Sequence, residues 1–216
     1  MKRLFLTASL DTDNVAESVS KHINISGKLK TALILTPVEA EQQIGLKTWE
    51  GEEREALNRA NFSTFDYTIT GKNITQIKSD LNGIDVLYIS GGNEFYFREK
   101  CNESNFEIFV KEFVDSGRPY IGTSCGSIMA GKDISATLKL NDLTCLKHPV
   151  DTRGFNLVDF SILPHWGLED FKTGYTSEGF EDMYKTNRSL VAINNYQYIE
   201  VIGDNYSITD VRKEKL

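Results

Sequence analysis

The chain has 216 residues, of which 40% are apolar and 25% are charged, with 12 Phe and 9 Tyr. This composition is typical of a globular protein, and a chain of this length can build a core without disulfide or metal staples. Lysine and arginine number 24 against 31 aspartate and glutamate residues, and the resulting net charge of −7 argues against a general nucleic-acid-binding surface. No run approaches the roughly 20 apolar residues of a membrane-spanning helix.

The N-terminal segment is basic and then apolar, which resembles a secretory signal, but Asp11 and Asp13 interrupt the apolar stretch too early. The three cysteines are odd in number and show no CxxC spacing, so they predict neither a disulfide framework nor a zinc site. We therefore expect a cytoplasmic monomer or homodimer without a metal or organic cofactor. We expect no nucleic-acid and no membrane partner.

Up to residue 132, short apolar runs alternate with longer polar or amphipathic segments. The predicted strands cover residues 4–8, 31–36, 65–69, 85–90 and 119–123, and the predicted helices cover residues 13–22, 47–61, 73–82 and 104–116. Asp13 is a candidate N-cap and Gly117 a candidate C-cap. Unbroken apolar strands that alternate with helices indicate a mostly parallel sheet covered on both faces, which is a three-layer α/β sandwich.

Beyond residue 132 the pattern changes. Strands are expected at 157–163 and 189–193, and a C-terminal β-hairpin over 198–211 is expected to turn at Gly203-Asp204-Asn205. No internal repeat, low-complexity tract or linker divides the chain. We therefore predict one α/β domain over residues 1–216.

The segment Gly122-Thr123-Ser124-Cys125-Gly126 matches the G-x-S-x-G pattern, with a predicted strand before it and a helix after it. On such a sharp turn the serine hydroxyl projects outward, and side chains at the flanking glycines would collide with neighbouring elements. The backbone N–H of Cys125 would then face a developing oxyanion. The alternative is a tight turn with an ordinary serine. Cys125 itself is expected to point toward the sheet and to pack there.

A second glycine-rich loop, Ser90-Gly91-Gly92-Asn93, follows the predicted strand 85–90 and emerges at the same carboxyl edge of the sheet. Because Gly91 and Gly92 lack side chains, a backbone N–H there can approach a substrate carbonyl and donate a second oxyanion hydrogen bond. A plain strand-to-helix turn would use the same residues.

A serine nucleophile needs a base, and histidine is the usual one. The chain has three histidines. His22 falls in the first predicted helix, far from the carboxyl edge, and His148 falls in a polar loop. His165 follows an apolar strand that ends in Pro164, and from there it can reach the loop of another strand. We therefore favour His165, with a structural histidine as the alternative.

Three motifs in this order resemble those of the peptidase E (aspartyl dipeptidase-like) serine peptidases: Ser90–Tyr96, Gly122–Ser127 and Leu163–Trp166. The order and spacing agree across roughly residues 80–170. The resemblance implies a class I glutamine-amidotransferase-like (flavodoxin-like) fold, and a peptidase that acts through a Ser-His-acid triad.

Carried over to this sequence, the resemblance implies Ser124 as the nucleophile and His165 as the general base. It also implies an oxyanion hole formed by the N–H groups of Gly92 and Cys125, with Asn93 near the substrate. The residue after the serine is usually Ala in the family and is Cys125 here, but its backbone N–H is retained.

An acidic residue should orient the histidine and stabilise its charged form. The family's Asp often follows Asn, and Asp142 fits if a three-residue insertion is allowed. Some members use a Glu from a late loop, but the corresponding stretch here has Asn195 rather than a carboxylate. Asp142 is therefore the predicted third member, whereas Asp151 and Asp159 are expected to be surface residues.

In peptidase E, which this sequence resembles, an Arg downstream of the histidine is expected to bind the aspartyl side chain of the substrate. Here Gly174–Gly179 occupies that neighbourhood, and the next arginine is Arg188. A buried substrate carboxylate without a cation would be costly. We therefore expect no strict preference for an N-terminal Asp, and a related small peptide or isopeptide fits equally well.

The leading hypothesis is a serine-type hydrolase of small peptides, dipeptidase-like or exopeptidase-like, that forms an acyl-enzyme. The alternative is a catalytically weak or inactive binding protein that keeps the fold, since the late-loop carboxylate and the arginine are missing. A glutaminase that uses Cys125 is a third hypothesis.

Overall fold

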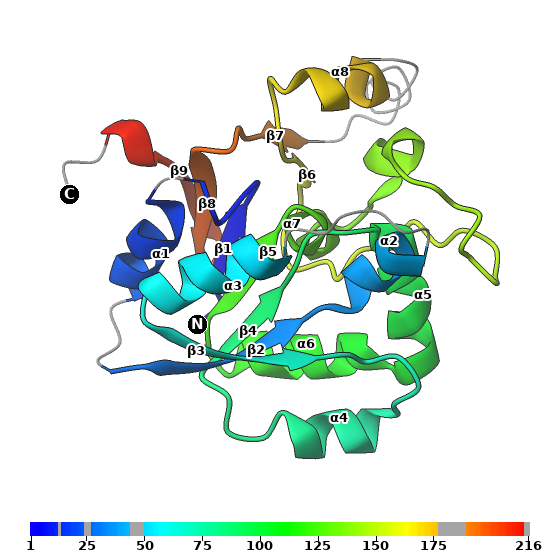
Figure 1. Cartoon of the computed structure of the whole chain (residues 1–216), viewed down its shortest axis with the longest axis horizontal. Coiled ribbons are helices and arrows are strands. Elements are labelled where there is room, and N and C mark those ends of the chain that lie inside the picture. The colour runs from blue at the N-terminus through cyan, green and yellow to red at the C-terminus, as the bar shows by residue number, and fades with distance from the viewer. Residues whose placement is uncertain (13, 24–26, 44–49, 177–188, 214–216) are drawn as a thin grey trace.

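The computed structural model describes residues 1–12, 14–23, 27–43, 50–176 and 189–213. Its centre is a seven-stranded sheet in the order β3-β2-β4-β5-β1-β8-β9, with helices on both faces (Figure 1). The strands of this sheet are β1 (Arg3–Thr7), β2 (Leu29–Ile34), β3 (Phe62–Tyr67), β4 (Val86–Ile89), β5 (Tyr120–Thr123), β8 (Gln197–Ile202) and β9 (Asn205–Asp210). The five strands from β3 to β1 are parallel, and the hairpin β8–β9 joins β1 antiparallel.

The helices are α1 (Val15–Ile23), α2 (Glu39–Gln43), α3 (Glu50–Arg59), α4 (Ile74–Asp80), α5 (Glu94–Ser104), α6 (Phe106–Asp115), α7 (Cys125–Ala130) and α8 (Glu169–Thr176), with short 3₁₀ segments η1 (Thr36–Val38), η2 (Ser135–Leu140) and η3 (Val211–Lys213). Two further strands, β6 (Ser161–Leu163) and β7 (Leu190–Ala192), pair in parallel as a separate small sheet. In the described part of the chain, no helix is both long enough and apolar enough to cross a bilayer.

The alternation of side chains along β1 explains the three layers. Leu4 and Leu6 belong to a core cluster with residues of α4, α5, α6 and α7, whereas Phe5 belongs to a second cluster with residues of α1 and α3. Successive residues of a strand point to opposite faces, so both faces of this central strand are buried. The predicted fold class, a three-layer α/β sandwich with a mostly parallel sheet and a C-terminal hairpin, is confirmed.

The predicted elements up to residue 90 are all present within a few residues of the expected bounds, although the expected N-cap Asp13 and residues 47–49 of the predicted helix 47–61 lie outside the described residues. The expected strand 157–163 is shorter, because only β6 is extended, and it pairs with β7 rather than with the main sheet. Helix α5 was not predicted. The expectation of one domain, and of a monomer or homodimer, stays a prediction.

Candidate active site

Ser124 lies at the turn between β5 and α7, at the carboxyl edge of the main sheet. Its backbone has φ +48° and ψ −106°, a conformation that residues with a Cβ rarely adopt. The turn is held on both sides: the N–H of Ser124 donates to the carbonyl of Thr7 at 3.0 Å, and the carbonyl of Ser124 accepts from the N–H of Ile128 at 2.9 Å. The serine therefore forms a sharp strand-to-helix bend, as its motif predicts.

The two glycines of the motif are required by close packing. A Cβ at Gly122 would lie 2.5 Å from the carbonyl oxygen of Gly126, and a Cβ at Gly126 would lie 2.3 Å from the carbonyl oxygen of Ile89 in β4. Both distances are well inside van der Waals contact with backbone atoms that cannot move aside. The turn can therefore approach β4 only with glycine at both positions.

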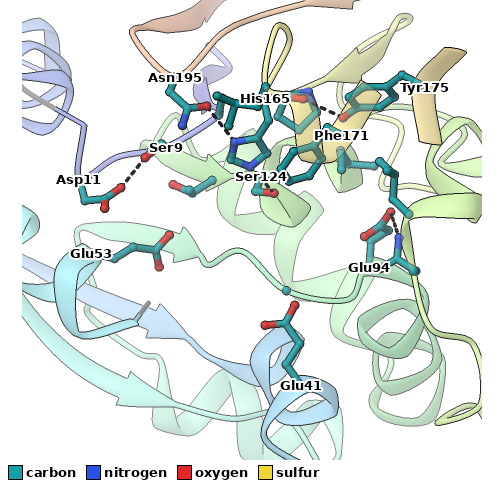
Figure 2. Close-up of a pocket in the computed structure, with 18 residues that line it drawn as sticks. Ser9, Asp11, Glu41, Glu53, Glu94, Ser124, His165, Phe171, Tyr175 and Asn195 are labelled. Atoms are coloured by element: carbon teal, nitrogen blue, oxygen red, sulfur yellow. Dashed lines mark hydrogen bonds between the residues drawn. The ribbon is translucent and has the colours of Figure 1, made fainter. Parts of the chain in front are cut away.

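His165 follows β6 by two residues and reaches the main sheet from outside it. Its Nε2 lies 3.1 Å from the Oγ of Ser124 (Figure 2). The imidazole stacks on the ring of Phe171, with 4.4 Å between centroids, and its backbone φ is +59°. The structure thus brings Ser124 and His165 into hydrogen-bond contact, although they are 41 residues apart in the chain.

The other imidazole nitrogen of His165 faces an amide. Its Nδ1 lies 2.8 Å from the Oδ1 of Asn195, which belongs to the turn before β8. An amide oxygen only accepts hydrogen bonds, so this contact places the proton of a neutral imidazole on Nδ1. The Nε2 atom is then left as an acceptor that faces the serine hydroxyl.

The environment of His165 favours the neutral ring. Removal of the ring from water lowers its pKa below the usual histidine value, and this effect exceeds the opposing influence of the Asn195 hydrogen bond and of the nearby carboxylate of Asp11. A neutral imidazole at physiological pH can accept a proton, which is the state that a general base requires.

Two backbone N–H groups in the loops at this edge of the sheet have no acceptor within the part of the chain that the structure describes. Among the described residues, no group accepts a hydrogen bond from the N–H of Gly92 or of Cys125. Cys125 is the first residue of α7, and Gly92 has φ +124° in the loop after β4. A Cβ at Gly92 would lie 2.4 Å from the carbonyl group of Pro37, so this close approach also requires glycine. These are the two groups that the sequence predicts as oxyanion donors.

The structure does not bring Asp142 to His165. The exposed carboxylate of Asp142 instead accepts hydrogen bonds from the N–H of Thr144 at 2.9 Å and from its hydroxyl at 2.7 Å. These two bonds lower the pKa of Asp142 below its usual value. The residue at hydrogen-bond distance from Nδ1 is Asn195, so the expectation of Asp142 as its partner is corrected.

Asn93, expected near the substrate, is the N-cap of α5. Its Oδ1 accepts from the N–H groups of Phe95 and Tyr96 at 3.0 and 2.9 Å, and its Nδ2 donates to the carbonyl of Asp142 at 2.8 Å. The side chain is 5% exposed and does not belong to the described residues that line the cavity at Ser124. Asn93 therefore stabilises the start of a helix, and the structure does not place its side chain with Ser124 and His165.

The remaining candidates have other surroundings or other partners. Nδ1 of His22 lies 2.9 Å from a carboxylate oxygen of Glu200, and His148 is exposed in a loop. The thiol of Cys125 is fully buried, and burial raises its pKa well above the usual cysteine value. A thiol in this state is a poor nucleophile, as the expected packing role implies. Asp151 pairs with Arg153 at 2.7 Å, and Asp159 is exposed.

Ser124 and His165 open into a cavity of about 380 Å³ between the main sheet and α8 (Figure 2). One part of its lining is apolar and consists of Ile128, Leu140, Pro164, Leu168, Phe171 and Tyr175. The other part carries four acidic side chains, Asp11, Glu41, Glu53 and Glu94. Cavities of this size and of mixed lining are typical of sites for small ligands.

Glu94 is one of the two buried acids in this group, together with Glu53. It is 2% exposed and accepts hydrogen bonds from the hydroxyl of Thr137 and, at 2.8 Å, from the Nδ2 of Asn141. Burial raises its pKa to about 7, against the lowering effect of these hydrogen bonds. Glu94 therefore changes its charge near neutral pH.

Sequence reasoning did not find these acids. Glu41 and Glu53 belong to segments rich in helix-forming polar residues, which look like solvated helix faces, and Glu94 belongs to the helix that was not predicted. Among the described residues, no group of three His, Cys, Asp or Glu side chains could hold a metal ion. Asp11 and Glu94 could have been recognised as site residues from their positions just after strands, because ligand sites of α/β folds form at the carboxyl edge of the sheet.

The sequence profile of peptidase family S51 matches residues 4–209 of the chain. An uncharacterized peptidase of Pasteurella multocida is 23% identical over 93% of this chain and 94% of its own length. An uncharacterized peptidase of Listeria monocytogenes is 24% identical over 94% of this chain and 96% of its own length. A peptidase E of Shewanella amazonensis is 29% identical over 49% of this chain and 41% of its own length.

Solved structures show the same architecture. The crystal structure of a candidate peptidase E from Listeria monocytogenes superposes with a TM-score of 0.83 at 21% identity, covering 97% of this chain and 98% of its own. A peptidase from an acI-B1 actinobacterium superposes with a TM-score of 0.71 at 15% identity, covering 97% of this chain and 88% of its own. At these identities the likeness establishes a common fold.

Proposed function

Because this chain belongs to peptidase family S51 and is a peptidase, we propose that it cleaves small peptides by a serine mechanism in which Ser124 is the nucleophile and His165 the general base. The observation that carries this proposal is the 3.1 Å contact between Ser124 Oγ and His165 Nε2, made at the wall of a cavity. A serine on a strained turn, in contact with a neutral imidazole, is the arrangement that activates a hydroxyl.

In the first step, Ser124 Oγ bonds to the peptide carbonyl carbon while its proton moves to Nε2 of His165. The carbonyl oxygen gains negative charge and accepts hydrogen bonds from the N–H groups of Gly92 and Cys125. The carbon–nitrogen bond then breaks, the proton passes from Nε2 to the leaving amine, and an acyl-serine remains. Water repeats the sequence: it loses a proton to Nε2, bonds to the acyl carbon and displaces Ser124 Oγ, which takes the proton back.

We assign Asn195 a positioning role in this mechanism. Its Oδ1 holds the Nδ1 proton of His165, so that Nε2 stays available to the serine. A neutral amide stabilises the imidazolium less than a carboxylate does, because it supplies a dipole rather than a charge. The Ser-His-Asn arrangement therefore gives correct geometry with weaker stabilisation of the charged intermediate.

The size of the cavity supports a short substrate. A volume of about 380 Å³ lies at the lower end of the range for small-ligand sites, and helix α8 with the segment before it covers one side. Such a cavity admits one or two residues beside the attacked carbonyl. We therefore propose exopeptidase or dipeptidase action on small peptides rather than cleavage within folded proteins.

The test is replacement of Ser124 by alanine, with activity and covalent labelling as separate readouts. Ser124→Ala should lower kcat/KM on a dipeptide and blocked-peptide library by about 10⁴-fold or more and should abolish labelling by a serine-directed phosphonate. Ser79→Ala, at an exposed position of α4, is the matched control and should retain both. Equal hydrolysis by Ser124→Ala, or wild-type labelling at another residue, would contradict the assignment.

A further inference from the structure

The cavity at Ser124 is strongly acidic on one side. Asp11 follows β1, Glu41 lies on α2, Glu53 on α3 and Glu94 at the start of α5, and all four line the same cavity. In Figure 2 the carboxylates of Asp11 and Glu53 point toward the cavity from the side opposite Phe171 and Tyr175. Three separate helices and the loop after β1 thus bring carboxyl groups to one small volume, and Glu94, with its pKa of about 7, is charged in only part of the molecules at neutral pH.

Two of the four acids are removed from water, whereas Asp11 is exposed and Glu41 is half-buried. Glu53 and Glu94 are each 2% exposed. The carboxylate of Glu41 contributes to the raised pKa of Glu94, and that of Asp11 raises the pKa of His165 against the dominant effect of burial. At low effective dielectric, charges several ångströms apart still interact by more than thermal energy.

Glu53 is held in place by the main sheet. It interacts with the hydroxyl of Tyr88 in β4, and that hydroxyl lies 2.8 Å from the Oγ1 of Thr123, the residue before Ser124. A carboxylate fixed in this way is preorganised, so a ligand that pairs with it does not have to order it first. The acidic side of the cavity is therefore part of the same rigid frame as the serine.

The described lining of the cavity supplies no matching positive charge. Among the described residues that line it, none is lysine or arginine. An anionic substrate group would enter a region that already carries like charge, and its desolvation would not be offset. A cationic group would be stabilised by the carboxylates that surround it.

The apolar side of the cavity needs no charge. Leu168, Phe171 and Tyr175 of the α8 region lie beside His165, and Phe171 stacks directly on its ring. An uncharged, apolar part of a substrate can fill this space. The cavity therefore offers two different environments on either side of Ser124.

We propose that this peptidase selects peptides that carry positive charge on the acyl side of the cleaved bond, and that Glu53, Glu41 and Asp11 set this preference. The inference rests on the proposed function, because it assigns a substrate class to the same cavity. The charge can come from an α-ammonium group or from a lysine or arginine side chain, since both present a cation to the carboxylates. A substrate with an aspartyl residue at this position is disfavoured.

Aminoacyl-coumarin amides test the acyl side directly, because their leaving group is constant, uncharged and apolar. Lys, Arg, norleucine and Asp amides are compared, each with a free and an acetylated α-amino group. Norleucine matches lysine in shape without its charge. We expect kcat/KM for Lys and Arg to exceed that for Asp by about 100-fold when the side chain supplies the cation, through a cation gain and an anion penalty of about tenfold each, and by about tenfold when the α-ammonium group supplies it.

The acetylated series separates the two sources of charge. If acetyl-Lys keeps about a tenfold advantage over acetyl-norleucine, the side chain supplies the cation. If Lys and norleucine are equal when free and both lose about tenfold on acetylation, the α-ammonium group supplies it. If neither charge has an effect, or if Asp is preferred, the inference is wrong.

Charge-removing variants locate the effect. Glu53→Gln should reduce the Lys-to-Asp ratio of kcat/KM by about tenfold, and Glu41→Gln and Asp11→Asn should each reduce it by a smaller factor. Glu55→Gln is the matched control, because Glu55 is exposed on the same helix α3. Each ratio is measured within one variant, so a loss of folded protein cancels. An unchanged ratio in all three cavity variants would overturn the assignment.

Calorimetric binding of Lys-Ala and Asp-Ala to Ser124→Ala separates failure of this inference from failure of the proposed function. Preferential binding of Lys-Ala by Ser124→Ala, together with hydrolysis that persists in this variant, would keep the inference and remove Ser124 as nucleophile. Ser124-dependent hydrolysis that is indifferent to charge would keep the mechanism and remove the inference. Tighter binding of Asp-Ala would remove the inference in either case.

Discussion

Ser124 and the pair His165–Asn195 are positioned in different ways. Ser124 follows β5 of the main sheet, where a Cβ at Gly122 or Gly126 would lie within 2.5 Å of a backbone oxygen and a backbone hydrogen bond to Thr7 holds the turn. His165 and Asn195 come from the small sheet β6–β7 and the loop after it. The serine side of the site, Ser124 and its turn, is therefore fixed by backbone packing. The histidine side, His165 with Asn195, is fixed by the way the small sheet and its loops pack on the main sheet.

The histidine side is itself one unit. The N–H of Trp166 donates to the carbonyl of Ile193 at 3.0 Å, and the N–H of Ile193 donates to the carbonyl of Leu163 at 3.0 Å. These bonds tie the loop of His165 to the loop of Asn195. Any displacement of this unit therefore moves both residues relative to Ser124, and the geometry of the 3.1 Å contact depends on the junction between the two regions.

The largest expected effect comes from breaking the serine side. Gly126→Ala would place a Cβ against the carbonyl of Ile89, so we expect a loss of unfolding free energy of about 3 kcal/mol or more. Denaturant unfolding monitored by circular dichroism measures this. Gly51→Ala is the control: its Cβ would meet nothing within 4 Å on α3, and it should stabilise the chain by about 0.5–1 kcal/mol. Equal stability of the two variants would contradict the packing argument.

The next effect concerns the junction. Glu94, at the start of α5, is bonded to Thr137 and Asn141 in and beside η2, and η2 packs on α8. Because its folded-state pKa of about 7 lies above its unfolded value, the folded protein holds a proton that the unfolded chain releases between about pH 4.5 and pH 7. Stability is therefore lost as the pH rises through this window.

Glu94→Gln removes that loss. We expect the variant to be more stable than wild type at pH 8, by up to about 3 kcal/mol, and to show a smaller or no gain at pH 4.5. Urea unfolding at several pH values measures the difference. Glu112→Gln, at the surface of α6, should follow the wild-type profile. A gain that does not depend on pH would show that Glu94 is not the titrating group.

A smaller effect is expected at the contact between His165 and Asn195. Asn195→Asp would place an anion on Nδ1 of His165, which favours the imidazolium and raises the pKa of the histidine. Activity in the proposed mechanism requires the neutral ring, so the acidic limb of kcat/KM should lie below pH 6.5 in wild type and move to higher pH by roughly one unit in the variant.

The pH profile of kcat/KM on one dipeptide is the measurement for this shift. Asn82→Asp, at an exposed position after α4, adds the same charge elsewhere and should leave the acidic limb unchanged. A shift of equal size in both variants would indicate a general charge effect rather than the contact with His165.

The smallest effect is expected at the residue that sequence reasoning preferred. Asp142→Asn should change kcat/KM by less than about threefold, because the carboxylate of Asp142 bonds to Thr144 and not to His165. Steady-state kinetics on the same dipeptide checks this. A loss of 100-fold or more would return Asp142 to the triad and remove Asn195 from its proposed role.

The sequence predicts the serine side well because its information is local. The glycines at 122 and 126 and the apolar strands beside them express one backbone requirement within a few residues. The partner of His165 has no local signature, since Asn195 is brought to it by the packing of loops 30 residues apart. The family resemblance did point to Asn195 in the late loop, but the expectation that the partner must be a carboxylate led to Asp142 instead.

Helix α5 shows a second limit. Its residues Glu94, Arg98, Glu99 and Lys100 are all buried, together with the aromatic residues between them, so the helix has no polar stripe that would mark it. Glu99 accepts from the backbone N–H groups of Lys147 and His148 and thereby holds a loop. Because such polar residues are buried against partners elsewhere in the fold, the helix lacks the alternation of polar and apolar faces by which a periodicity analysis finds helices.

The place of β1 in the sheet has a consequence for how the molecule assembles. Leu6 is paired on one side with Gly122 of β5 and on the other with Ile199 of β8, so β1 obtains its neighbours from strands that are synthesised more than a hundred and nearly two hundred residues later. Loops of that length must close before the pairing contributes, which slows folding. Until β8 has been synthesised, one edge of β1 remains unpaired. Asn195, which lies just before β8, cannot reach His165 before that point.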